Sequence, residues 1–124
     1  MKKGVALFAH GSRDPRWKAP FVELEKRLSD RAPCDLTVKT AFLQDCEPNL
    51  FDVIGAMAKD GCAKITIVPM FLAVGAHAAK DFPEIAQKLR NSYADISFEW
   101  TEVIGQWDET QNALASVLAD KLSD

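Results

Sequence analysis

The sequence lacks the features of membrane, secreted and nucleic-acid-binding proteins. No apolar run approaches the roughly 18 residues that a membrane-spanning helix needs. The two lysines after Met1 precede an apolar stretch too short for a signal peptide. Basic residues are few, since 15 Lys and Arg face 18 Asp and Glu and the net charge is −3. We therefore expect a cytoplasmic protein that binds neither a membrane nor a nucleic acid.

Cysteine and histidine are also scarce. The three cysteines, Cys34, Cys46 and Cys62, are odd in number and form no close CxxC pair. This pattern suggests neither a disulfide framework nor a thiolate zinc site, and we expect reduced, mostly buried thiols. Histidine occurs only twice, as His10 and His77.

The composition that remains is that of one globular domain. The 124 residues are 48% hydrophobic and 27% charged, which are ordinary values for a folded domain. A chain of this length builds one core, and no linker or low-complexity tract divides it. We expect a single domain over residues 1–124.

The apolar pattern alternates between strands and helices. Expected strands cover residues 5–9, 36–43, 65–72 and 96–103, with pairing of the third ending at Pro69. A first helix carries an apolar stripe of Trp17, Phe21, Leu24 and Leu28, with Pro20 in its first turn. A second lies between Pro48 and Gly61. A third is capped by Asp81 with Pro83 in its first turn, and a last one from about Asp108 buries Leu114, Val117 and Leu118.

This alternation predicts an α/β fold, a single-domain three-layer αβα sandwich with a four-stranded, mainly parallel sheet of the flavodoxin-like kind. Ligands of such sheets bind beyond the carboxyl ends of the strands. His10 follows the first expected strand and His77 the third, and these strands should be neighbours. The two imidazoles can therefore approach one crevice, although a single loop histidine is more often a polar loop residue or helix cap.

Imidazole is a common ligand of first-row divalent metals and also accepts protons near neutral pH. Two histidines cannot complete a closed four-ligand zinc site, so a bound ion would be exchangeable. Arg13, Arg16 and Lys80 bring positive charge to the same crevice, which suits a polycarboxylate ligand but also fits solvated helix starts. The apolar run from Met70 to Val74 could lie against a flat aromatic ligand or could end a buried strand.

Three segments carry a resemblance to a known family: residues 8–16 (FAHGSRDPR), 41–48 (AFLQDCEP) and 68–83 (VPMFLAVGAHAAKDFP). With them the chain resembles, over nearly its whole length, the small CbiX-like sirohydrochlorin chelatases of the class II chelatase family. The resemblance implies insertion of Co²⁺ or Fe²⁺ into the tetrapyrrole sirohydrochlorin, a homodimer, and metal handling by His10 and His77. Cobalt would place the enzyme in vitamin B12 synthesis and iron in siroheme synthesis, and imidazole also accepts Ni²⁺. The divalent metal is a substrate, and no permanently bound cofactor is expected.

Substrate contacts are expected from residues of the same loops: Ser12, Arg13, Arg16, Gln44, Phe71, Leu72, Gly75 and Lys80. The chain departs from the family pattern at Gln44, where many relatives carry a glutamate, and at Ala76, where Gly-Gly-His is common. A neutral amide cannot accept a pyrrole proton. Either Asp45 or Glu47 takes that role, or the histidines suffice.

Two other function classes fit less well. A non-catalytic metal or tetrapyrrole carrier would use the same crevice and would differ from a chelatase only in lacking turnover beyond one equivalent. A hydrolase or phosphoryl-transfer enzyme would use Ser12 or His10. The sequence has no G-x-S-x-G elbow around Ser12 and no Walker loop, and Ala9 rather than arginine precedes the His-Gly pair.

Overall fold

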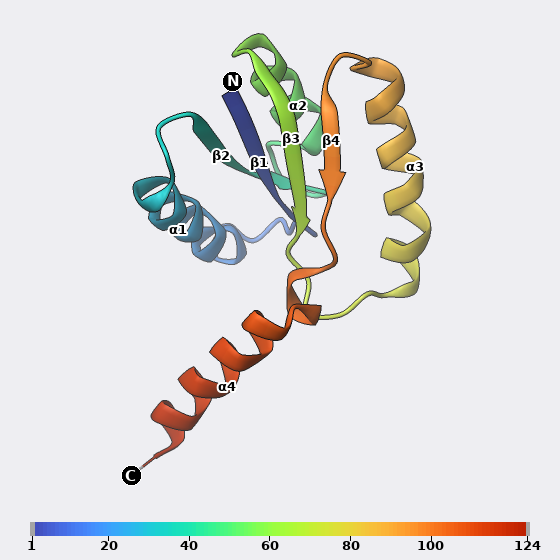
Figure 1. Ribbon diagram of the computed structural model, residues 1–124. Helices are drawn as coiled ribbons and strands as arrows, with labels where there is room; N and C mark the ends of the chain where they lie inside the picture. The colour runs from blue at the N-terminus through green and yellow to red at the C-terminus, as the bar shows by residue number, and fades with distance from the viewer. Residues whose placement is uncertain (1, 124) are drawn as a thin grey trace.

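The protein is a parallel α/β sandwich in the computed structural model, which describes residues 2–123, without the side chains of 77–79. Four parallel strands form one sheet in the order β2-β1-β3-β4 (Figure 1). Their bounds are β1 (Lys2–Ala9), β2 (Leu36–Phe42), β3 (Cys62–Pro69) and β4 (Ser97–Trp100). The predicted fold class is confirmed, the first and third strands are neighbours, and β3 ends at Pro69.

Four α-helices follow the strands in alternation. They are α1 (Pro15–Arg31), α2 (Leu50–Lys59), α3 (Ala76–Ser92) and α4 (Asp108–Leu122), with a short 3₁₀ helix, η1 (Ile104–Gln106), before α4. The cap of α2 is Asn49, whose side chain accepts a hydrogen bond from the backbone N–H of Asp52. The cap of α1 is Asp14, which accepts from the N–H of Arg16 in the same way.

The main core lies between the sheet and the layer formed by α2 and α3. Ala6, Phe8, Ile65 and Ile67 point from β1 and β3 to this side and are fully buried. They pack against buried side chains of both helices, namely Leu50, Val53, Ile54, Met57 and Leu89. This face of the sheet is closed.

The opposite face has a smaller core. Leu7, Val38 and Val68 are buried there, with Leu28 of α1 and Trp107 packed partly buried against them. No residue of α1 is buried. Trp17, Phe21 and Leu28 of its predicted apolar stripe are half-buried, but Leu24 is 39% exposed. This face is therefore covered less completely than the α2 and α3 face.

Two helices begin earlier than the proline positions predicted. Helix α1 starts at Pro15, so Pro20 lies in its second turn rather than its first. Helix α3 starts at Ala76 with Gly75 as its N-cap, so Asp81 and Pro83 lie inside it and Asp81 is not its cap. The run from Ala76 to Lys80 has good helix formers, and their propensity extends the helix towards the strand. Pro20 and Pro83 each lack a backbone N–H donor, but neither proline ends its helix.

The last helix differs most from the prediction. Leu114, Val117 and Leu118 were expected to be buried, but they are 40%, 57% and 56% exposed. Helix α4 points away from the sheet, and none of residues 108–122 is buried (Figure 1). The fourth strand is also shorter than expected. It ends at Trp100, and after residues 101–103 the chain forms η1.

The cysteines are free, as predicted, but only Cys62 is buried, while Cys34 is exposed and Cys46 is half-buried. Among residues 2–123, no helix is long and apolar enough to cross a membrane.

Candidate functional site

Three βα loops meet at the carboxyl edge of the sheet. Two backbone hydrogen bonds continue the pairing of β1 and β2 beyond the strands. The N–H of Leu43 donates to the carbonyl of Ala9 at 2.9 Å, and the N–H of Gln44 donates to the backbone carbonyl of His10 at 3.1 Å. On the other side, the N–H of Met70 donates to the carbonyl of Phe8 at 2.7 Å. The first loop is thus held between the loops after β2 and β3. This is the edge at which open parallel sheets bind ligands.

Gly11 lets two of these loops interlock. Its φ of +102° favours glycine, and a Cβ built at this position would lie 1.7 Å from the carbonyl oxygen of Gln44. Any side chain at residue 11 would push the loops apart. The His-Gly pair of the sequence therefore has a structural cause, namely that the residue after His10 must have no side chain.

His10 is exposed and its ring contacts both loops. Its Nδ1 lies 3.2 Å from the carbonyl oxygen of Gly11, and its Nε2 lies 3.4 Å from the amide nitrogen of Gln44. A carbonyl oxygen only accepts hydrogen bonds, so the contact with Gly11 assigns the proton of neutral His10 to Nδ1. Nε2 then carries the lone pair, which faces the Gln44 amide at 3.4 Å and can bind a metal ion or a proton when that long contact opens.

His77 lies in the first turn of α3, where it is the second helical residue, and not in the loop predicted for it. Its side chain lies outside the described residues. Gly75, the N-cap of α3, has no side chain that could accept a hydrogen bond from the first turn. Lys80 is exposed and also belongs to the start of this helix. His10 thus follows β1 directly, whereas residues 70–76 separate His77 from the end of the neighbouring strand β3.

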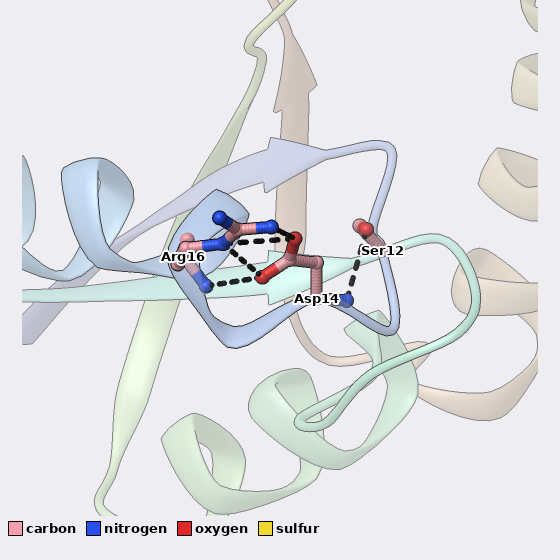
Figure 2. A network of polar contacts seen from close by, with 3 residues as sticks. All are labelled: Ser12, Asp14 and Arg16. Atoms are coloured by element: carbon pink, nitrogen blue, oxygen red, sulfur yellow. Dashed lines mark hydrogen bonds and ion pairs between the residues drawn. The ribbon is translucent and has the colours of Figure 1, made fainter.

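The positive residues of the first loop are partly paired with acidic ones. Figure 2 shows Asp14 between Ser12 and Arg16: its carboxylate accepts from the Arg16 guanidinium, and its N–H donates to Ser12 Oγ at 3.1 Å. The ion pair with Arg16 is 2.7 Å long. These bonds lower the pKa of Asp14 and raise that of Arg16. Arg13 has only a 3.8 Å contact with Asp45, and its side chain is 91% exposed.

Ser12 has a structural role in this loop. It is half-buried, and its hydroxyl is the acceptor that orders the turn before α1. Arg13, Arg16 and Lys80 are all exposed, and Arg16 is engaged by Asp14, so their role toward a polycarboxylate ligand stays a prediction.

The apolar side of the edge is supported by stacked aromatic rings. Phe71 packs on Phe82 with ring centroids 5.7 Å apart, and Phe82 packs in turn on Phe8 and Trp100. Leu72 is 71% exposed. Below it, Gly105 approaches so closely that an added Cβ would lie 2.1 Å from the Leu72 carbonyl oxygen. The loop after β3 therefore presents an apolar surface on a firm aromatic base.

Several residues that shape this edge were not singled out from the sequence. Gly11, Asp14, Phe82 and Gly105 act through backbone conformation, capping and packing. Only the Asp14 cap had a local signal, namely Asp followed directly by Pro15 at a helix start. Asp45, named as a possible replacement for the missing glutamate, has a positive φ of 65° and lies beside Arg13.

Acidic and thiol ligands do not gather around His10. Within the described residues there is no group of three or more His, Cys, Asp or Glu side chains arranged to hold a metal ion.

Comparison with known proteins identifies the family. The CbiX family model matches residues 4–121. The chain is 34% identical over 98 residues to the sirohydrochlorin cobaltochelatase of Methanosarcina barkeri, covering 79% of this chain and 75% of that protein. It is also 34% identical over 84 residues to the protein of the same name from Methanosarcina acetivorans, covering 68% of this chain but 64% of the relative.

Solved structures agree with this assignment. A cobalamin (vitamin B12) biosynthesis CbiX protein from Marinobacter aquaeolei superimposes with a TM-score of 0.87 at 27% identity, covering 98% of this chain and 96% of that one. The sirohydrochlorin chelatase SirB from Bacillus subtilis, solved with cobalt, superimposes with a TM-score of 0.81 at 25% identity. The match covers 97% of this chain, which spans about half (51%) of SirB. The protein therefore belongs to the CbiX family of metal chelatases.

Proposed function

We propose that this protein is a sirohydrochlorin chelatase that inserts Co²⁺ into the tetrapyrrole, with Fe²⁺ as the alternative metal. The observation that carries the proposal is the exposed imidazole of His10, whose Nε2 lone pair lies where the loops after β1 and β2 interlock. The names of the relatives from Methanosarcina favour cobalt. The location is expected to be the cytoplasm.

The reaction requires a proton balance. A divalent ion that enters the ring binds four pyrrole nitrogens, and two pyrrole protons leave. We assign His10 and His77 to metal delivery and proton acceptance, because a neutral imidazole can do either. Two imidazoles bind a divalent ion less firmly than a closed four-ligand site, so they can release the ion to the ring.

The macrocycle is proposed to lie on the apolar side of the edge. Phe71 and Leu72 would contact its flat face, since Leu72 is largely exposed and Phe71 is held from below by Phe82. Its peripheral carboxylates would face Arg13, Arg16 and Lys80, of which Arg13 has the weaker acidic contact. Ser12, Gln44 and Gly75 complete the proposed contacts from the same loops.

Gln44 departs from the family pattern, because many relatives carry a glutamate at this position. Its amide nitrogen faces His10 Nε2 and donates rather than accepts. In this assignment, Gln44 orients the lone pair of His10, and proton acceptance falls to the histidines. The Gln44→Glu variant tests this assignment. We expect its rate of metal insertion to be unchanged or lower, whereas a marked increase would assign proton acceptance to a carboxylate at residue 44.

The function is tested by following the sirohydrochlorin spectrum anaerobically with Co²⁺ or Fe²⁺, against a control without protein. Multiple turnovers are expected, with Co²⁺ faster. His10→Ala and His77→Ala should each lower the rate about 100-fold or more, the range of a lost acid or base group. Lys88→Ala, on the exposed surface of α3, is the matched control and should leave the rate unchanged.

The outcomes separate an enzyme from a carrier. Binding of one equivalent of metal or tetrapyrrole without turnover would assign the site to a carrier. Full activity in both histidine variants would overturn the assigned roles while leaving the chelatase activity itself intact.

A further inference from the structure

The loop between β2 and α2, residues 43–49, has two arms that are held in different ways. The outgoing arm is bonded to the first loop through backbone atoms, because the N–H of Gln44 donates to the carbonyl of His10. The return arm begins with residues 45–47, which make no backbone–backbone hydrogen bond within the described part of the chain. The position of the return arm therefore depends on side chains that reach it from other elements.

Lys18 of α1 is such a side chain. Its ammonium donates to the backbone carbonyl of Glu47 at 2.6 Å and lies 5.5 Å from the centroid of the Phe42 ring. A hydrogen bond from an ammonium group is stronger than one between neutral groups. Lys18 is half-buried, and no carboxylate among residues 2–123 forms an ion pair with it. Its charge is thus committed to one neutral carbonyl and one aromatic ring, and we call the bond to Glu47 the Lys18 clamp.

The packing around Lys18 gives the clamp a firm base. Lys18 lies in the first turn of α1, the helix that Asp14 caps. Its neighbours Trp17 and Phe21 pack on Phe42 with ring centroids 5.8 Å and 6.3 Å apart, and Phe42 is buried at the end of β2. The start of α1 is thereby fixed against the strand that leads into the loop.

The return arm reaches the proposed substrate site through Arg13. Asp45 lies 3.8 Å from the Arg13 guanidinium and is its only ion-pair partner among the residues that the structure describes. The side chain of Arg13 is 91% exposed, so little else holds it in place. Contacts therefore lead from α1 through the clamp and the return arm back to the first loop.

We propose that Lys18 is a positioning residue for the tetrapyrrole substrate. By holding the Glu47 carbonyl, it keeps the return arm in place. The arm in turn keeps Asp45 beside Arg13, in the geometry that receives the ring carboxylates. This role rests on the proposed function, because it assigns Arg13 to the substrate. Loss of the ammonium should weaken substrate binding and leave the chemistry at His10 unchanged, because backbone bonds hold that part of the edge.

Hydrogen exchange tests the clamp without any substrate. Lys18→Met keeps an apolar side chain of similar length but loses the ammonium, so the return arm should open more often. The arm ends at Pro48, whose carbonyl accepts from the Phe42 N–H at 2.9 Å. Exchange of this N–H, followed by NMR, should become about 10-fold faster. The Gln44 N–H, bonded to His10, should exchange as in the unmutated protein. Equal exchange of the Phe42 N–H in both proteins would overturn the clamp.

Steady-state kinetics tests the role in substrate binding. Lys18→Met should raise the KM for sirohydrochlorin about 10-fold and leave kcat unchanged, which is the pattern of lost binding rather than lost chemistry. Lys18→Arg can donate to the same carbonyl and should restore the KM. Lys26→Met, on the exposed surface of the same helix, is the matched control and should change neither constant. A lowered kcat with an unchanged KM would overturn the role, and so would faster exchange of the Phe42 N–H with an unchanged KM.

A double variant separates the bond from the charge. Lys18→Met combined with Ala19→Lys restores the net charge, but residue 19 lies about 100° round the helix from residue 18, so its ammonium does not replace the bond. This variant should keep the high KM. A normal KM would assign the effect to charge alone and overturn the proposal. Absence of turnover by the unmutated protein would refute the proposed function and with it the role in binding, whereas the exchange measurement decides the clamp by itself.

Discussion

The two faces of the sheet differ in how completely their helices cover them. Helix α2 has ten residues and buries four of them, whereas α1 has 17 and buries none, although both have a clear apolar stripe. Both faces receive alternate side chains of the same four strands, so the sheet does not cause the difference. The cause is the number of helices: α2 and α3 close one face, while α1 is alone on the other because α4 points away. An apolar stripe predicts that a surface can pack, but the rest of the fold decides whether another element of the chain faces it.

Removing a side chain from the closed face should have the largest effect on stability. Ile54 is fully buried between α2 and the sheet, so Ile54→Ala should lower the free energy of unfolding by about 2–5 kcal/mol. Val22→Ala, on the exposed part of α1, is the comparison and should cost about 0.5 kcal/mol or less. Urea unfolding measures both. Equal losses of unfolding free energy in the two variants would show that the two faces do not differ in packing.

The loops at the carboxyl edge allow a second contrast. Gly11→Ala should lower the free energy of unfolding by about 1–3 kcal/mol from its positive φ, and the clash with Gln44 adds to this. Gly75→Ala is the matched control, because its φ is −88° and no atom lies within 4 Å of the added Cβ. We expect a change of about 0.5 kcal/mol or less there. Thermal unfolding of the two variants checks the difference.

A half-buried side chain on α1 tests whether the open face is covered in solution. Leu28→Ala should cost about 1 kcal/mol, less than a fully buried leucine. If a second copy covers this face, the unfolding temperature of the unmutated protein should rise with protein concentration, and the loss caused by Leu28→Ala should rise with it. A loss that is the same from micromolar to millimolar protein would argue for a face left open to water.

The helix caps predict a smaller, pH-dependent difference. Asp14, the cap of α1, has a pKa lowered by its bonds with Arg16, whereas Asn49, the cap of α2, does not titrate. A carboxyl whose pKa is lower in the folded state stabilises the fold above its ordinary pKa of 3.8, and this contribution is lost as the pH falls through the lowered value.

The comparison of Asp14→Asn with the unmutated protein measures that contribution. The unfolding temperature of the variant should be lower at neutral pH, and the two proteins should converge in acid. The same difference at every pH would show that the charge of Asp14 contributes nothing.

The sequence predicted the sheet because strand signals are local. The buried runs of β1 and β3 stand out as continuous apolar segments, and the alternation with helices implies parallel pairing. The helix starts were less predictable. Pro83 suggested a start near Asp81, but the helix-forming run before it starts α3 at Ala76, which places His77 in a helix.

The surroundings of the candidate site were predicted only in part. The placement of His10 after β1 followed from the strand pattern, whereas its contacts with Gly11 and Gln44 depend on two loops 33 residues apart in the chain, from residue 11 to residue 44. Helix α4 shows the same limit. Its leucines have the spacing of a buried stripe, but burial depends on whether a surface faces them, and that is a property of the assembled fold.

The junction between the first two loops separates folding from chemistry at residue 44. His10 and Gly11 contact the backbone N–H and carbonyl of Gln44, so the loops are held together by atoms that every residue type except proline shares. The side chain at residue 44 makes no part of this junction and faces His10 Nε2 instead. Residue 44 can therefore exchange an amide for a carboxylate without rebuilding the loops, and mutation there can tune the reactivity of the site at little cost to folding.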